Sequence, residues 1–258
     1  MLNSLYSRCC RIMAKHPRIL FGEILLFALV IRLIFWYGNP VVGRDELYYF
    51  GKAIGGQYFS SLCVSPGNHP PLPEALLKTT YQLFSISTPV GMMISARTLS
   101  LCISILGIAP YYFIGQILFS RKLYSFLLMF FAAVMPIWVE LSVTFLRESF
   151  TIPIAAYVLW GLLCYLTSPN MWKCALLGLG VATGAMCRYE FVEWLLFCVL
   201  GIAITIIAGR RKLLDALFDL LGLGITFSGL YLLMPILLGQ DWNSQIIILT
   251  SAFQRLYQ

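Results

Sequence analysis

Residues 19–37 decide the fold, and they read ILFGEILLFALVIRLIFWY. A helix that crosses a bilayer needs roughly 20 mostly apolar residues, and this run has that length. It is too long for the apolar core of a signal peptide, and no small-residue cleavage site follows it. Its last residues, Phe35-Trp36-Tyr37, are aromatic, as is typical of the membrane–water interface. We therefore predict a retained transmembrane helix at the start of the chain.

The rest of the chain has the same apolar character. Of its 258 residues, 60% are hydrophobic and only 11% are charged, and the mean hydropathy is +0.83. The apolar runs are continuous, whereas the strands of a membrane β-barrel alternate apolar and polar residues. We therefore predict an all-α polytopic membrane protein in which residues 1–258 form a single transmembrane domain.

Basic residues gather in four clusters beside the apolar runs. The clusters are Arg8, Arg11, Lys15 and Arg18; Arg121 and Lys122; Lys173; and Arg210, Arg211 and Lys212. The net charge of +7 would suit nucleic acid or an anionic membrane surface, but Lys and Arg also concentrate in the cytoplasmic loops of membrane proteins. The placement favours this second interpretation. We therefore assign all four clusters and the N-terminus to the cytoplasm, and we expect no nucleic-acid partner.

This assignment divides the chain into about seven transmembrane helices. They are predicted at residues 19–37, 92–119, 123–143, 150–167, 173–187, 191–208 and 216–238. Residues 38–90 then form a long outer loop, in which the short apolar segment 72–84 is expected to be a helix that lies on the membrane. If that segment crossed the bilayer, Arg121 and Lys122 would fall outside, against the charge rule.

The topology brings most of the remaining charged residues to one face. Asp45, Glu46, His69, Glu74, Arg147, Glu148, Arg188 and Glu190 are all predicted there. We therefore expect a site that uses carboxylates and cations at the outer boundary of the membrane.

Asp45 and Glu46 are adjacent carboxylates that follow the first span. Two carboxylates beside a bilayer are costly unless they lie in water or serve a site. At helical spacing Asp45 shares a face with Tyr48 and Tyr49. Such a carboxylate can act as a general base toward a hydroxyl or an amine. The alternative is an ordinary helix N-terminus with acidic residues in its first turn.

His69 lies in a second polar segment, Asn68-His69-Pro70-Pro71-Leu72. The two prolines fix their own φ angles, and Pro70 favours an extended conformation at His69. The imidazole would then be held at a defined angle, from which it can donate a hydrogen bond to a phosphate. The alternative is a rigid turn that only ends the loop before the next helix.

Arginine–glutamate pairs occur at two successive outer turns, Arg147 with Glu148 and Arg188 with Glu190. Each could be an interfacial ion pair of little energetic value, but together they suggest the walls of a polar cavity. Arginine suits phosphate recognition because its forked guanidinium is always charged. Arg32, inside the first span, either extends to the outer interface or faces the same cavity.

These residues together resemble the GT-C membrane glycosyltransferases, in particular the protein O-mannosyltransferase and lipid A aminoarabinose transferase superfamily. The resemblance runs in chain order through Arg32, Asp45-Glu46 with Tyr48-Tyr49, His69-Pro70-Pro71-Leu72, Ser95-Ala96-Arg97, Glu148, and the glycine-rich segment from Gly178 to Arg188.

The resemblance implies an enzyme that takes a sugar from a polyprenyl-phosphate carrier. It would transfer the sugar, with inversion, to a lipid, glycan or protein acceptor at the periplasmic or lumenal face, here of a bacterial cell membrane. Asp45 would be the base or would orient the acceptor, Glu46 would support the site, and His69 would lie near the carrier phosphate. Glu148 would match a second acidic position.

The chemistry of this transfer fits the residues that are present. A phosphate leaving group needs cations, and Arg147, Arg188 and His69 are the candidates. No metal is required, although a divalent ion at Asp45 and Glu46 would be compatible. The eight cysteines include no CxxC pair and no His/Cys cluster at zinc spacing, so they predict no zinc site.

Members of this family usually continue with further spans and an outer domain, so the resemblance covers the family's N-terminal core. The alternative function is therefore a non-catalytic subunit or a fragment that binds a lipid carrier or a partner enzyme. A transporter would place ionisable residues at mid-membrane and show inverted repeats. Here the charges are expected to gather at one face instead.

Overall fold

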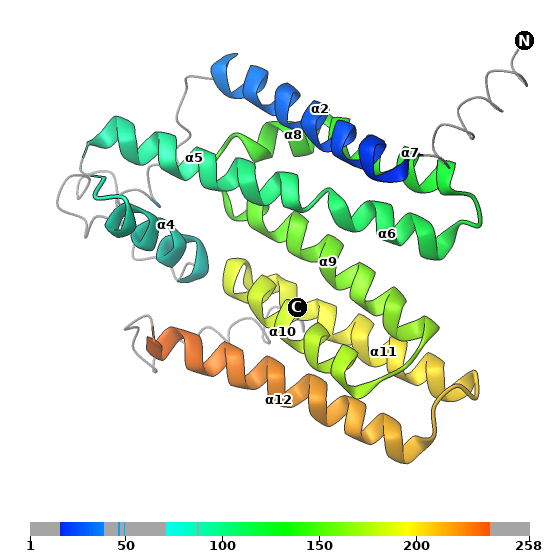
Figure 1. The fold of residues 1–258 in the computed structure, drawn as a ribbon. Coiled ribbons are helices and arrows are strands. Elements are labelled where there is room, and N and C mark those ends of the chain that lie inside the picture. Colours follow the sequence, from blue (N-terminus) through cyan, green and yellow to red (C-terminus); the bar gives the residue numbers. More distant parts are fainter. Residues whose placement is uncertain (1–15, 39–45, 47–48, 50–70, 87, 238–258) are drawn as a thin grey trace, which may run out of the picture.

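The computed structural model describes residues 16–38, 46, 49, 71–86 and 88–237, and within these ranges the chain is helical without any strand (Figure 1). The helices are α2 (Pro17–Gly38), α4 (Pro71–Leu83), α5 (Pro89–Leu106), α6 (Ala109–Leu118), α7 (Lys122–Val134), α8 (Pro136–Ser142), α9 (Arg147–Thr167), α10 (Met171–Cys187), the 3-10 helix η1 (Tyr189–Glu193), α11 (Trp194–Ile207) and α12 (Leu213–Leu237).

Five helical segments in the described part of the chain are long and apolar enough to cross a membrane. They are Pro17–Gly38, Val90–Leu118, Arg147–Thr167, Tyr189–Ile207 and Leu213–Leu233. A sixth is added if α7 and α8 are one span bent by 55°. The 17 residues of α10 extend about 25 Å, less than the roughly 30 Å of a hydrocarbon core. The prediction of an all-α polytopic membrane protein is confirmed, and the count of seven spans stays a prediction.

Local sequence explains where several helices begin. Thr88 caps α5, because its Oγ1 accepts a hydrogen bond of 3.2 Å from the N–H of Gly91, and Pro89 occupies the first helical position. Asn170 caps α10 in the same way, through a 3.0 Å bond from the N–H of Trp172. The predicted segment 72–84 forms helix α4, and its position on the membrane surface stays a prediction.

The predicted span over residues 123–143 is broken at Pro136. Pro136 cannot donate the hydrogen bond that the carbonyl of Ala132 would accept, and α7 ends at Val134. The carbonyl groups of the last turn of α7 therefore need other partners.

Arg32 meets this need from helix α2. Its Nη1 donates to the carbonyl of Ala133 at 2.9 Å, its Nε donates to Ser104 Oγ at 3.1 Å, and its guanidinium lies 5.8 Å from the centre of the Trp138 ring. The residue is fully buried. The buried side chain does not extend to the outer interface, so that interpretation of Arg32 was wrong, and the alternative of a shared cavity stays a prediction. Its positive charge instead stabilises the C-terminal end of α7.

Most of the described charged residues lie toward one or the other end of the helical bundle, because consecutive long helices alternate in direction (Figure 1). What we call the basic end carries Arg18, Arg121, Lys122, Lys173, Arg210, Arg211 and Lys212. What we call the carboxylate end carries Glu46, Arg97, Arg147, Glu148, Arg188 and Glu190. This separation agrees with the predicted grouping of charges, whereas the orientation of the bundle in a membrane stays a prediction.

An ion pair with a fully buried carboxylate joins helices at the basic end. Asp219 of α12 accepts bonds of 2.8 and 2.9 Å from Nε and Nη2 of Arg211, and a bond of 2.8 Å from the Tyr165 hydroxyl of α9. Hydrogen bonding to Asp219 raises the pKa of Arg211, so the guanidinium stays charged. This network fixes the turn between α11 and α12 against α9.

Candidate functional site

The predicted site residues fall into two groups with respect to the structure. Asp45, Tyr48 and His69 lie outside the described residues, so their roles stay predictions. Glu46, Tyr49, Arg147, Glu148 and Arg188 are described, and all of them lie at the carboxylate end.

Glu46 is fully buried and makes contacts with two other segments of the chain. Its Oε1 accepts a 3.3 Å hydrogen bond from Nε of Arg97, and its Oε2 accepts a 3.1 Å bond from Nη2 of the same guanidinium. The backbone N–H of Phe145 donates to Oε1 at 2.7 Å. Arg97 belongs to α5, and Phe145 lies in the turn between α8 and α9. One carboxylate therefore joins the first loop to α5 and to the start of α9.

Tyr49 lies in the apolar wall beside this carboxylate. It is only 3% exposed, and its ring packs edge-to-face on Phe145 with 5.7 Å between the ring centroids. Phe145 packs in turn on Phe150 at 5.2 Å, and Leu77 of α4 belongs to the same buried cluster. The ring of Tyr49 thus helps to hold the first loop against α4 and α9, and its predicted contact with substrate stays a prediction.

The two arginine–glutamate pairs come together in space. Arg188 Nη1 lies 3.3 Å from Glu148 Oε1, and Arg147 Nε lies 3.4 Å from the same oxygen. Arg188 Nε donates to Glu190 Oε2 at 3.3 Å. The four side chains are 29–53% exposed, so this four-residue cluster meets solvent or lipid headgroups. We call it the arginine–glutamate cluster.

Helix ends position the arginine–glutamate cluster. Arg147 and Glu148 form the first turn of α9, where an acidic residue is favoured by the helix dipole. Arg188 directly follows α10 in an extended conformation, and its N–H donates to the carbonyl of Gly184 at 2.8 Å. A Cβ at position 184 would lie 2.2 Å from the Phe191 ring, so this close approach requires glycine. The glycine therefore lets η1 fold back tightly on α10, which sets the position of Arg188.

The arginine–glutamate cluster is neutral overall but retains hydrogen-bond donors. Each guanidinium carries five N–H donors, and the ion pairs engage only Nε of Arg147 and Nε and Nη1 of Arg188. An anion that displaced part of this pairing could accept two parallel N–H hydrogen bonds from the guanidinium of either arginine. Phe145, which binds Glu46, lies two residues before Arg147 (147 − 145), so the buried carboxylate and the cluster are parts of one structure.

In the sequence Arg97 is part of the Ser95-Ala96-Arg97 motif, which does not identify the partner of its side chain. The available signal was an arginine inside an apolar run, which requires a counter-charge when it is buried. The partner lies 51 residues earlier in the chain, and no spacing rule connects residues that far apart.

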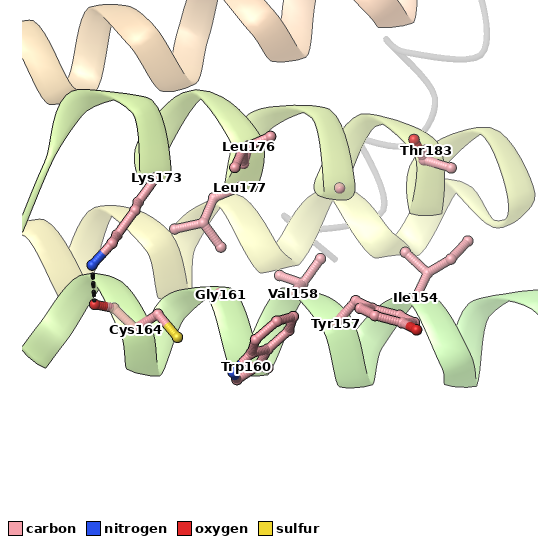
Figure 2. Close-up of a pocket in the computed structure, with 11 residues that line it drawn as sticks. Ile154, Tyr157, Val158, Trp160, Gly161, Cys164, Lys173, Leu176, Leu177 and Thr183 are labelled. Carbon is pink, nitrogen blue, oxygen red and sulfur yellow. Dashed lines mark hydrogen bonds between the residues drawn. The ribbon is translucent and has the colours of Figure 1, made fainter. Parts of the chain in front are cut away.

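A groove of about 410 Å³ runs between α9 and α10 (Figure 2). It is almost entirely apolar, with side chains such as Trp160 and Leu177 in its walls. At the basic end, Lys173 Nζ donates to the carbonyl of Cys164 at 3.0 Å. Thr183 lines the other end, five residues before Arg188 (188 − 183). The groove therefore leads along α10 toward the arginine–glutamate cluster.

Over the part of the chain that the structure describes, no three His, Cys, Asp or Glu side chains are close enough to hold a metal ion. The described carboxylates of the site instead bind arginine, as Glu46 and Glu148 do. No protein-family model, no curated protein and no solved structure matches this chain.

Proposed function

We propose that this chain is a GT-C-like glycosyltransferase that moves a sugar from a polyprenyl-phosphate carrier to an acceptor at the carboxylate end. The observation that carries the proposal is the meeting of Glu46, Glu148 and Arg188, which come from three separate segments, at one end of an apolar bundle. Charged groups are rare in such a protein, and those gathered at one end mark a functional site.

The proposed reaction uses these residues in defined roles. Asp45 accepts the proton of an acceptor hydroxyl or amine, whose oxygen or nitrogen then bonds to the anomeric carbon of the sugar. The bond between that carbon and the phosphate oxygen breaks, and the polyprenyl phosphate leaves with the electron pair. Arg147, Arg188 and His69 stabilise the negative charge that develops on the phosphate.

The groove between α9 and α10 supports a lipid-linked donor. An isoprenoid chain is apolar, and burial of its methyl and methylene groups contributes about 0.8 kcal/mol per CH₂. The groove is apolar and leads toward Arg188, so a carrier whose phosphate binds the cluster can extend its chain along α10.

The basic end gives the proposed orientation. Its lysines and arginines favour the cytoplasm, which puts the carboxylate end on the periplasmic or lumenal side of the membrane. A carrier-linked sugar would then be consumed on the outer face of a cell membrane, where acceptors for such sugars are found.

A second candidate function is a non-catalytic subunit that binds a lipid carrier or a partner enzyme. The mutual pairing of Arg188 with Glu148 and Glu190 favours it, because paired charges are less available for chemistry. It predicts binding of polyprenyl phosphate without any turnover.

A transfer assay tests the proposal and separates the two candidates. Purified protein in nanodiscs is incubated with a panel of polyprenyl-phosphate sugars and a lysate-derived acceptor fraction, and products are identified by mass spectrometry. We expect one donor to be consumed by the wild type and not by Asp45→Asn at equal folded amounts. Binding of donors without consumption would support the subunit instead, and full activity of Asp45→Asn would refute the role of that carboxylate.

A further inference from the structure

Arg97 is an arginine buried within a candidate membrane span. It belongs to the segment Val90–Leu118 and is 2% exposed. An unpaired guanidinium at such a position would be strongly destabilising. Glu46 provides the counter-charge, although it lies in a different segment of the chain.

The geometry of the pair is specific to arginine. Nε and Nη2 of Arg97 point to separate oxygens of Glu46, at 3.3 and 3.1 Å, which is the paired arrangement that a planar guanidinium allows. A lysine has a single ammonium on a flexible stem and cannot make two parallel bonds of this kind. The backbone of Phe145 completes the arrangement with a third bond of 2.7 Å.

These bonds hold Glu46 against two other segments of the chain. Arg97 belongs to α5, and Phe145 lies in the turn between α8 and α9. Phe145 is two residues before Arg147, which limits their Cα separation to about 7 Å. The turn that leads into the arginine–glutamate cluster is therefore bound to the carboxylate that Arg97 pairs with.

We propose that Arg97 is a positioning residue, which acts through Glu46 to hold the first loop at Glu46 against the turn that leads into Arg147 and Glu148. The inference rests on the proposed sugar transfer and changes the role of one residue in it. Because the Glu46 carboxylate is fully buried and both of its oxygens accept bonds from the protein, Glu46 positions the site and does not touch substrate.

The matched control is the ion pair at the basic end. Arg211 and Asp219 also form a paired arrangement, at 2.8 and 2.9 Å, with a fully buried carboxylate. Arg211→Gln therefore removes the same kind of interaction far from the carboxylate end. A merely structural role predicts that Arg97→Gln and Arg211→Gln have the same kind of effect, namely a lower yield of folded protein with unchanged turnover per folded molecule.

The experiment compares wild type, Arg97→Lys, Arg97→Gln, Glu46→Gln and Arg211→Gln. Hydrogen–deuterium exchange is measured on peptides that cover residues 39–55, and kcat and KM for the donor are measured per folded molecule. A misplacement of about 1 Å can lower a rate on the order of 100-fold. We expect faster exchange and a roughly 100-fold lower kcat with little change in KM for Arg97→Gln, an intermediate kcat for Arg97→Lys, and neither effect for Arg211→Gln. Glu46→Gln keeps the volume and the acceptor for Phe145, so it tests the pair if Arg97→Gln does not fold.

The two readouts separate the outcomes. Unchanged exchange at residues 39–55 in both Arg97→Gln and Glu46→Gln overturns the inference, whatever the activity. Equal losses of kcat in Arg97→Gln and Arg211→Gln also overturn it. If the wild type transfers no sugar from any donor, the proposed function fails and Arg97 has no role in transfer. Hydrogen–deuterium exchange alone then shows whether Arg97 holds the first loop.

Discussion

Gly184→Ala tests how the arginine–glutamate cluster is positioned. Gly184 lies in helix α10, and a Cβ at this position would be 2.2, 2.3 and 2.6 Å from three atoms of the Phe191 ring. The ring is 6% exposed and stacks on Trp194 at 5.5 Å, with an angle of 16° between the planes. It therefore has little room to move, and η1 must shift away from α10.

The expected magnitude follows from two opposing terms. Alanine in place of glycine inside a helix contributes about 1 kcal/mol of stability through helix propensity. Overpacking of a well-filled site costs typically 1–3 kcal/mol, and here contacts about 1 Å below the ordinary separation put the cost at the upper end. We expect a net loss of about 1–2 kcal/mol in the free energy of unfolding. Since Arg188 connects α10 to η1, we also expect a lower kcat.

Gly224→Ala is the matched control for this substitution. Gly224 also lies inside a long helix, α12, but a Cβ there would have no neighbour within 4 Å. Only the propensity term remains, so Gly224→Ala should be stabilising by up to about 1 kcal/mol. Unfolding in mixed micelles of increasing SDS fraction measures both variants. If Gly184→Ala is as stable as Gly224→Ala and equally active, then Phe191 does not set the position of the cluster.

Further predictions concern packing, the groove and topology. Gly178→Ala should lower the free energy of unfolding by about 2 kcal/mol in the same SDS titration, because its Cβ would lie 2.4 Å from the Leu223 carbonyl oxygen of α12. An unchanged unfolding midpoint would contradict the close approach of α10 and α12. Gly161→Leu should fill the groove and raise KM for a long-chain donor about 10-fold, which corresponds to a loss of about 1.4 kcal/mol in binding, and should leave KM for a donor of two isoprene units unchanged. Equal effects on both donors would exclude the groove as the site of the isoprenoid chain. Thr88→Cys should react with a membrane-impermeant maleimide in intact cells, whereas Gly209→Cys should react only after lysis, because the two positions lie at opposite ends of the bundle. The reverse labelling pattern would show that the proposed orientation is wrong.

Sequence alone predicted the features that depend on local composition. The length of an apolar run determines a transmembrane helix, so the first span predicted at 19–37 corresponds to α2 at Pro17–Gly38. Pro136 lies within the predicted span 123–143, but the 55° bend at this proline depends on how α7 and α8 pack on their neighbours. A proline indicates where a helix can break and not by how much.

Contacts between distant segments could not be predicted in the same way. Arg32 was expected either to extend to the outer interface or to face the outer cavity. It binds the Ala133 carbonyl, which the break in α7 makes available. Glu46 was expected to support a site, but its partner Arg97 follows from the folding of α5 against the start of α9. The meeting of Glu148 and Arg188 was suggested by alternating spans, because successive helix ends return to the same face.

The proposed site of sugar transfer is the carboxylate end of the bundle. The most direct measurement uses proteoliposomes in which the orientation of the protein is known from maleimide labelling of Thr88→Cys, with polyprenyl-phosphate sugar in the bilayer and the acceptor added on one side only. We predict that product forms only when the acceptor meets the carboxylate end. Product formed only from the side of the basic end, or no product from either side, would refute sugar transfer at the carboxylate end.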